Sequence, residues 1–245
     1  MKKEAAITVK NLHISYRGLK KFSIKRSLFK GGKNSKEVFE AVKGISFEVE
    51  KGKILGFIGK NGSGKSTTLR ALAGIFSPDK GIIDLHGNSV SLLSIGVGFQ
   101  PKLTGYENIY LSGMLLGFSE SQIREKEKEI IDFADIGDFI YKPVKTYSSG
   151  MHSKLAFAIT AILETDIMLI DEVLSVGDAA FKEKSYNKMK ELISDENRTV
   201  VIVSHSLDTI KNLCDEVLWL HNGEIKKYGD PEEVIEEYKE FMETK

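Results

Sequence analysis

Short apolar runs, separated by polar and glycine-rich segments, recur along the chain. Such runs are typical of strands when turn-forming residues bound them, and runs without polar alternation are typical of strands buried in a parallel sheet. We expect strands at residues 7–15, 45–49, 53–59, 167–170, 199–203, 216–220 and 224–228. His221, Asn222 and Gly223 join the last two runs and predict a hairpin turn.

Apolar residues at helical spacing predict the helices. We expect them within residues 64–76, 116–139, 147–163 and 231–243. Ser119 precedes Gln122 by three residues, which predicts a capping box. Strands alternating with helices predict an α/β fold whose mainly parallel sheet is covered on both faces, with an antiparallel layer from the N-terminal strands. We expect a single domain over residues 1–245, with an inserted helical subdomain at about 103–163.

Composition and charge exclude several classes of protein. Hydrophobic residues make up 41% and charged residues 29% of the 245, which is ordinary for a folded chain and excludes disordered and fibrous classes. The 35 basic and 35 acidic residues cancel, so no overall field favours nucleic acid, and we expect no nucleic-acid partner. The single cysteine, Cys214, excludes an internal disulfide and fits a reducing compartment. We also expect neither a membrane span nor a secretion signal.

One segment concentrates positive charge. Residues 17–36 contain no acidic residue and interleave their cations with apolar side chains, including Phe22 and Phe29. The cations are Arg17, Lys20, Lys21, Lys25, Arg26, Lys30, Lys33 and Lys36. We expect a basic insertion at about 17–37 that suits a membrane surface or an anionic lipid head group. A solvated lysine-rich loop is the alternative.

A glycine-rich sequence lies between the expected strand at 53–59 and the following helix. It matches the pattern G-x-x-x-x-G-K-[ST], whose backbone N–H groups wrap nucleotide phosphates at a helix N-terminus. The residues expected to bind are Gly59, Asn61, Gly62, Ser63, Gly64, Lys65, Ser66 and Thr67. Lys65 would reach the β and γ phosphates, Ser66 would ligate Mg²⁺, and Thr67 would add a phosphate contact. A chance match arises roughly once in a hundred chains of this length.

Two adjacent acids follow the apolar strand at 167–170. Asp171 would hold the Mg²⁺ shell, and Glu172 would act as the general base toward the attacking water. Adjacent acids at a strand end are otherwise often solvated turn residues. The phosphate loop favours the magnesium interpretation, so we expect a nucleotide and Mg²⁺ as the ligands.

The sequence Tyr147-Ser148-Ser149-Gly150-Met151 opens the expected helix at 147–163. With the phosphate loop and the acidic pair, it makes the chain resemble the ATP-binding-cassette (ABC) family of P-loop NTPases, whose signature usually reads L-S-G-G-Q. The resemblance covers nearly the whole chain and implies the ABC-type nucleotide-binding fold. It also implies that Ser148 and Gly150 bind the γ phosphate of ATP held by a second copy. Without the resemblance, residues 147–151 would be interpreted only as the N-terminal cap of a helix.

Three further positions follow the order of the family's motifs. Gln100 lies where the family has a glutamine that contacts Mg²⁺ and the water and senses the membrane subunit. Asp178 lies in the loop that acts across the interface between two copies, and His205 matches the histidine that hydrogen-bonds the γ phosphate. The alternatives are a polar loop residue, an exposed loop aspartate and an unremarkable histidine.

An aromatic ring stacks on adenine in this family. Tyr16 falls at the end of the first expected strand, where that ring is found. Phe22 and Phe39 are competing candidates, so the choice among the three stays open.

The sequence in and around the motifs resembles one branch of the ABC family, the ATPases that export lipid-linked polysaccharides. The matching segments are residues 103–109, 138–151 and 171–178. The branch implies a transmembrane permease partner, two ATPases with two permeases, and a peripheral position on the cytoplasmic side of the cell membrane. The expected cargo is wall teichoic acid, because no carbohydrate-binding domain follows the cassette, and O-antigen or capsular polysaccharide is the alternative.

Other functions remain as alternatives. An importer ATPase of the same family would differ in its membrane partner. A soluble, non-transport cassette ATPase typically has two cassettes or a long coiled-coil insertion, and this sequence shows neither. A GTPase would need an N-K-x-D motif, and residues 187–190 read N-K-M-K. A small-molecule kinase using the same phosphate loop is the remaining alternative.

Overall fold

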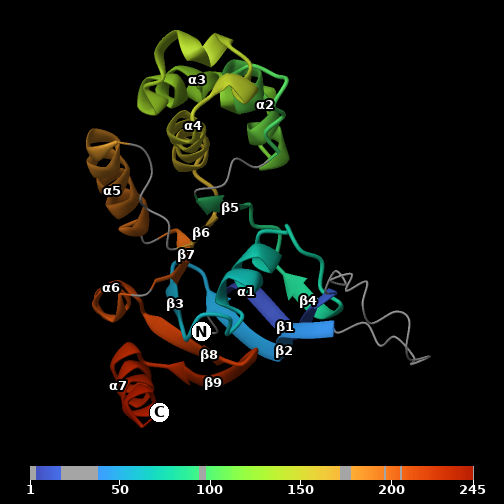
Figure 1. The fold of residues 1–245 in the computed structure, drawn as a ribbon, viewed down its shortest axis with the longest axis vertical. Helices are drawn as coiled ribbons and strands as arrows, with labels where there is room; N and C mark the ends of the chain where they lie inside the picture. The colour runs from blue at the N-terminus through green and yellow to red at the C-terminus, as the bar shows by residue number, and fades with distance from the viewer. Residues whose placement is uncertain are drawn as a thin grey trace, which may run out of the picture.

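The computed structural model describes residues 4–17, 38–93, 98–171, 178–195, 197–204 and 206–244. This part of the chain forms two sheets, helices that pack on the sheets, and a separate helical layer. The antiparallel sheet has the order β2 (Val38–Glu50), β1 (Ala5–Arg17), β4 (Lys80–Asp84). The larger sheet has the order β5 (Val90–Leu93), β6 (Ile167–Asp171), β7 (Thr199–Val203), β3 (Ile54–Ile58), β8 (Glu216–His221), β9 (Glu224–Gly229). Its strands are parallel except β9 (Figure 1).

Both faces of the parallel strands are buried, which explains their unbroken apolar runs. In β6, Ile167 and Leu169 face a core shared with the antiparallel sheet and α1 (Lys65–Leu72), whereas Met168 and Ile170 face the opposite core. That opposite face is covered by α5 (Ala179–Ile193), α6 (Leu207–Leu213) and α7 (Pro231–Glu243). The alternation follows from the two-residue period of a strand.

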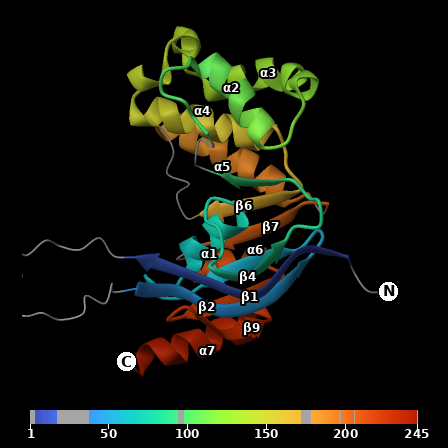
Figure 2. The same ribbon diagram turned by 90° about the vertical axis from the view of Figure 1, so that its right-hand side faces the viewer.

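The helical layer lies at one end of the molecule, above the parallel sheet (Figures 1 and 2). It consists of α2 (Gly105–Leu115), α3 (Glu120–Ala134), α4 (Ser149–Ile162) and two 3-10 turns, Gly137–Tyr141 and Val144–Thr146. These helices enclose their own apolar core, which includes the fully buried Ile109, Ile123, Ile130 and Leu155. Phe157 and Ala161 of α4 also belong to the core on the opposite face of the parallel sheet, so the layer has a core of its own and is packed on that sheet.

The predicted strands are all present, and the mainly parallel sheet with an antiparallel N-terminal layer is confirmed. The predicted hairpin joins β8 to β9, with positive φ at Asn222 and Gly223 as its tight turn requires. The capping box of Ser119 and Gln122 is also present. In the described ranges, no helix has the length and apolar character needed to cross a bilayer.

The predicted helix at 116–139 was wrong in its extent. Leu116 ends α2, and α3 stops at Ala134 because Asp135 takes a left-handed conformation with φ 47°. The sequence analysis did not predict five elements, namely β4, β5, α2, α5 and α6. In β4, most of the strand is exposed, so it lacks the apolar run that marks a buried strand.

Candidate functional site

The glycine-rich loop leaves the carboxyl end of β3 and enters α1. Gly59 has φ 142°, and a Cβ there would collide with the carbonyl oxygen of Leu220. Gly64 has φ 106°, and a Cβ there would lie 2.7 Å from the carbonyl oxygen of Ala41. Only glycine fits both positions, so the backbone of the loop can lie close to β8 and β2.

Two polar side chains of this loop, Ser63 and Lys65, are buried. The ammonium of Lys65, a residue 6% exposed, donates to the carbonyl oxygens of Gly59 at 2.6 Å and Lys60 at 3.1 Å. The buried Oγ of Ser63 has no hydrogen-bond partner within the described residues. The hollow has a volume of about 140 Å³ and is lined by residues 61–67 and Val203. A buried cation and an unpaired hydroxyl beside a helix N-terminus fit a phosphate group.

Asp171 approaches this loop from the neighbouring part of the sheet. It ends β6, and its Oδ1 accepts a hydrogen bond of 3.3 Å from the hydroxyl of Ser66 at the start of α1. A hydroxyl and a carboxylate are hard oxygen ligands that suit Mg²⁺, which commonly takes its remaining ligands from phosphates and water. Within the described residues, no group of three His, Cys, Asp or Glu could hold a metal by itself. Glu172 and His205 lie outside the described residues.

Tyr16 lies beside the end of the phosphate loop. Its hydroxyl and that of Thr67 are 3.0 Å apart, and its ring contacts Phe76 edge to face with centroids 5.9 Å apart. Phe39 is its cross-strand partner on β2 and is 60% exposed. Phe22 lies outside the described residues. The structure thus brings Tyr16, with Phe39 opposite it in the ladder, to the loop.

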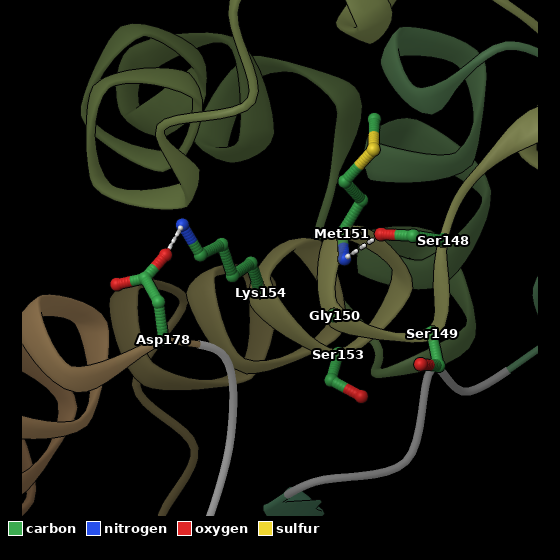
Figure 3. Close-up of a pocket in the computed structure, with 7 residues that line it drawn as sticks. All are labelled: Ser148, Ser149, Gly150, Met151, Ser153, Lys154 and Asp178. Carbon is green, nitrogen blue, oxygen red and sulfur yellow. Dashed lines mark hydrogen bonds and ion pairs between the residues drawn. The ribbon is translucent and has the colours of Figure 1, made fainter.

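The N-terminus of α4 opens into a second hollow, of about 360 Å³ (Figure 3). Ser148 caps the helix, its Oγ accepting from the backbone N–H of Met151 at 3.2 Å. A Cβ at Gly150 would meet only Ser148 Oγ, at 3.8 Å, so packing within the chain does not require glycine there. Glycine leaves its backbone N–H open to a ligand approaching the helix end.

Asp178 lines the same hollow and makes two contacts within its own chain. Its Oδ2 lies 2.7 Å from Nζ of Lys154 on α4 (Figure 3). Its Oδ1 accepts from the backbone N–H of Phe181, which caps α5. The hydrogen bond from Lys154, together with the cap, lowers the pKa of Asp178 to about 2. The sequence did not single out Lys154, which lies three residues after the signature.

Tyr147, where the family usually has leucine, packs against the core of the helical layer. Its hydroxyl donates to the carbonyl oxygen of Phe139 at 2.7 Å, and burial raises its pKa. A Cβ at Gly105 would collide with this hydroxyl. Gly105 therefore makes room for the tyrosine, a pairing between distant residues that sequence spacing alone does not predict.

Gln100 lies in the loop that leads to α2, and its side chain is exposed. Its backbone N–H donates to Oδ1 of Asn108 at 2.7 Å. Asn108 is fully buried, and the motifs assigned it no role, although it lies in the segment 103–109. The residues predicted for one nucleotide therefore fall in separate places: the phosphate loop with Asp171 and Tyr16, the hollow at α4, and the loop of Gln100.

The two hollows lie in different layers of one chain. The phosphate loop belongs to α1 beside the sheets, and the second hollow belongs to α4 in the helical layer (Figures 1 and 2). The first has the features of a nucleoside triphosphate site of the P-loop class. The second has a helix N-terminus and an open glycine without a phosphate loop of its own.

Comparison with known sequences agrees with this class. Residues 42–175 match the family described as ABC transporter, and the chain belongs to that family. The teichoic acids export ATP-binding protein TagH of Bacillus anthracis is 47% identical over 223 residues, covering 91% of this chain and 40% of that protein. The O-antigen export system ATP-binding protein RfbB of Klebsiella pneumoniae is 42% identical over 202 residues, covering 82% of each.

The chain is shorter than several of these relatives. It spans 40% of the TagH protein of B. anthracis and 64% of that of Listeria innocua. Chain length therefore does not separate teichoic acid export from O-antigen export.

Solved structures share the fold. The dimeric structure of an ATP-binding cassette in a post-hydrolysis state, bound to ADP and Pi, gives a TM-score of 0.68 at 20% identity, covering 92% of this chain and 98% of that one. An ATP-binding subunit of an ABC transporter gives 0.70 at 22% identity, covering 96% and 93%. The predicted ABC-type fold is confirmed.

Proposed function

We propose that this chain is the ATP-hydrolysing subunit of an ABC exporter that moves a lipid-linked polysaccharide across the cytoplasmic membrane. The observation that carries the proposal is the Ser66 hydroxyl beside the Asp171 carboxylate, directly next to the phosphate loop with its buried Lys65 and unpaired Ser63 hydroxyl. Those groups fit a nucleoside triphosphate with a divalent cation. The names of relatives more than 40% identical to the chain support export as the process.

The chain's own groups divide the chemistry between them. Lys65 and the loop N–H groups hold the phosphates, and Ser66, Asp171 and Gln100 are the candidate ligands of the cation. Mg²⁺, when bound, neutralises charge on the phosphate oxygens. Glu172 takes a proton from the attacking water, and His205 hydrogen-bonds the γ phosphate. Tyr16 is the candidate for stacking on adenine.

A second copy completes each site. Ser148 and Gly150 would contact the γ phosphate held by that copy, with Asp178 at the same interface. The separation of the two hollows within one chain supports this arrangement, because the hollow at α4 lies in the helical layer and not beside the phosphate loop. We expect two ATPases to pair with two transmembrane permeases, with the subunit peripheral to the membrane on its cytoplasmic side.

Wall teichoic acid is the first candidate cargo, since TagH proteins are prominent among the relatives. O-antigen is the second candidate, because RfbB of K. pneumoniae aligns over 82% of its own length as well as 82% of this chain. The basic residues of 17–37, which follow the end of β1 at Arg17 and otherwise lie outside the described residues, are proposed to meet the membrane surface or the anionic end of the cargo.

Reconstitution with the permease tests the proposal. The chain should co-purify with a polytopic permease and without a solute-binding protein, and lipid-linked teichoic acid should stimulate its Mg²⁺-dependent ATP hydrolysis more than lipid-linked O-antigen. Stimulation by the O-antigen lipid alone would reassign the cargo. Recruitment of a solute-binding protein would reassign the chain to an importer.

A further inference from the structure

A groove lies between α5 and α6, which cover the same face of the parallel sheet (Figure 1). Its volume is about 590 Å³, and sites for small organic molecules commonly measure about 300 to 1,000 Å³. Among the described residues that line it, only Val203 also lines the hollow at the phosphate loop. The groove is therefore a separate space, large enough for a small organic molecule.

Apolar side chains form the deep part of the groove. Ile170 of β6, Ile202 of β7 and Met189 of α5 line it, and each is 4% exposed or less. At the opening, α5 contributes the ring of Tyr186, which is 48% exposed, and α6 contributes Leu213, which is 36% exposed. A ligand with an apolar body would remove this apolar surface from water, which favours binding.

The α6 wall carries an acidic group. Asp208 lies in the first turn of α6, is exposed and lines the groove. Within the described part of the chain, its carboxylate forms no hydrogen bond or ion pair. Lys211, three residues further along the helix, pairs instead with Glu232 of α7 at 3.0 Å. The carboxylate of Asp208 is thus open to a positively charged ligand.

The α5 wall adds a second feature that favours a cation. α5 ends at Ile193, and Ser194 caps its carboxyl end; both residues line the groove. The carboxyl end of a helix carries partial negative charge. The one cation among the described lining residues, Lys190, lies over the ring of Tyr186, with Nζ 4.5 Å from the ring centroid. The charges of the groove therefore favour a ligand with a positively charged end.

We propose that this groove binds a small amphipathic amine, with an aromatic body against the apolar lining and an ammonium group toward Asp208. The apolar lining and the exposed ring of Tyr186 support the aromatic body, and the unpaired carboxylate supports the ammonium group. The inference goes beyond the proposed function and does not depend on ATP hydrolysis. Because Ile170 directly precedes Asp171, the bound amine lies next to the strand end that carries the candidate cation ligand.

The first experiment compares three probes that share an indole ring and differ in the end of the side chain. Tryptamine is a cation, tryptophol is neutral and indole-3-propionate is an anion at neutral pH. Binding is followed by NMR through the methyl signal of Met189, assigned with Met189→Leu. Tryptamine should bind about threefold to fivefold more tightly than tryptophol, as for an exposed ion pair, and indole-3-propionate should bind least tightly. Raising the salt concentration should remove the advantage of tryptamine.

The second experiment locates the binding site with two pairs of variants. Asp208→Asn should abolish the advantage of tryptamine over tryptophol, and Glu191→Gln is the control, since Glu191 lies on α5 outside the groove lining and pairs with Lys188. Asn212→Trp places a large ring at the groove and should weaken binding of all three probes by about tenfold or more. Lys211→Trp, on the side of α6 toward α7, is its control and should bind as the parent. Circular dichroism verifies that each variant is folded.

Several results would overturn the proposal. One is that no probe shifts the Met189 signal at millimolar concentration, and another is that the folded Asn212→Trp variant binds the probes as the parent does. Equal affinity for tryptamine and indole-3-propionate would exclude an amine site. A shift of the Met189 signal with protein concentration alone would assign the groove to a contact between copies. Absence of ATP hydrolysis in the parent would contradict the proposed function and leave these titrations unaffected.

Discussion

At the scale of single residues, Gln100 and Asp178 are each held by hydrogen bonds to residues for which no role was predicted. Asn108 binds one loop, and Lys154 with the N–H of Phe181 fixes Asp178. Lys154 and Phe181 belong to no motif, and Asn108 lies in the matching segment 103–109 without a predicted role. Their positions depend on residues brought together by folding, and spacing along the chain gives no signal for that.

Gly105 and Tyr147 form a pair that can be tested by stability. Gly105→Ala places a Cβ against the Tyr147 hydroxyl and 3.1 Å from Ile140, so we expect a loss of about 1 to 3 kcal/mol in the free energy of unfolding. The measurement is urea denaturation. Adding Tyr147→Leu, which removes the hydroxyl, should recover most of the loss. Equal losses in the single and double variants would exclude the steric explanation.

The ion pair of Asp178 and Lys154 has a pH signature. The folded pKa of about 2 lies below the ordinary value near 3.9, so the contribution to stability is present above about pH 4 and is lost as the pH falls toward 2. In Lys154→Met, the first cause of the shift is gone, and a carboxyl titration by NMR should show the pKa of Asp178 rising toward its ordinary value. Lys184→Met is the control: Lys184 lies on α5, the helix that Asp178 caps, and its replacement should leave the pKa of Asp178 unchanged.

At the scale of elements, the sequence predicted what local pattern determines. The sequence predicted the buried strands β6 and β7 from their apolar runs and the phosphate loop from its glycines, because these signals lie within the segments themselves. The exposed strand β4 and the short strand β5 were not, since sheet pairing stabilises them. Likewise, the motif predicts that Ser66 lies beside bound phosphates, whereas its contact with Asp171, far along the chain, is seen only in the fold.

Helix α4 provides a test of the composite site. Ser148→Arg fills the second hollow with a long cation, so ATP-dependent pairing of two copies should be lost while ATP binding by one copy stays within about twofold of the parent, because the phosphate loop is unchanged. Lys65→Ala should instead weaken nucleotide binding itself. Calorimetric titration and sizing chromatography with ATP separate the two effects. Identical losses of affinity in both variants would contradict a site shared between copies.

At the scale of the whole molecule, the residues proposed to bind nucleotide lie in two different layers. The two sheets carry the phosphate loop and Asp171, whereas the helical layer carries Ser148 and the loop of Gln100 (Figure 2). A second copy would bring the missing half of each site. This arrangement is the structural basis of the proposed pairing of two copies.

The most direct measurement of the central claim is steady-state phosphate release by the purified chain with ATP and Mg²⁺, compared with Glu172→Gln. The account predicts Mg²⁺-dependent turnover in the parent and a loss of about a hundredfold or more in the variant, because an amide cannot accept the proton of the attacking water. The variant should still bind ATP and accumulate as an ATP-bound dimer. Near-parental phosphate release by Glu172→Gln, or no release by the parent, would contradict the account.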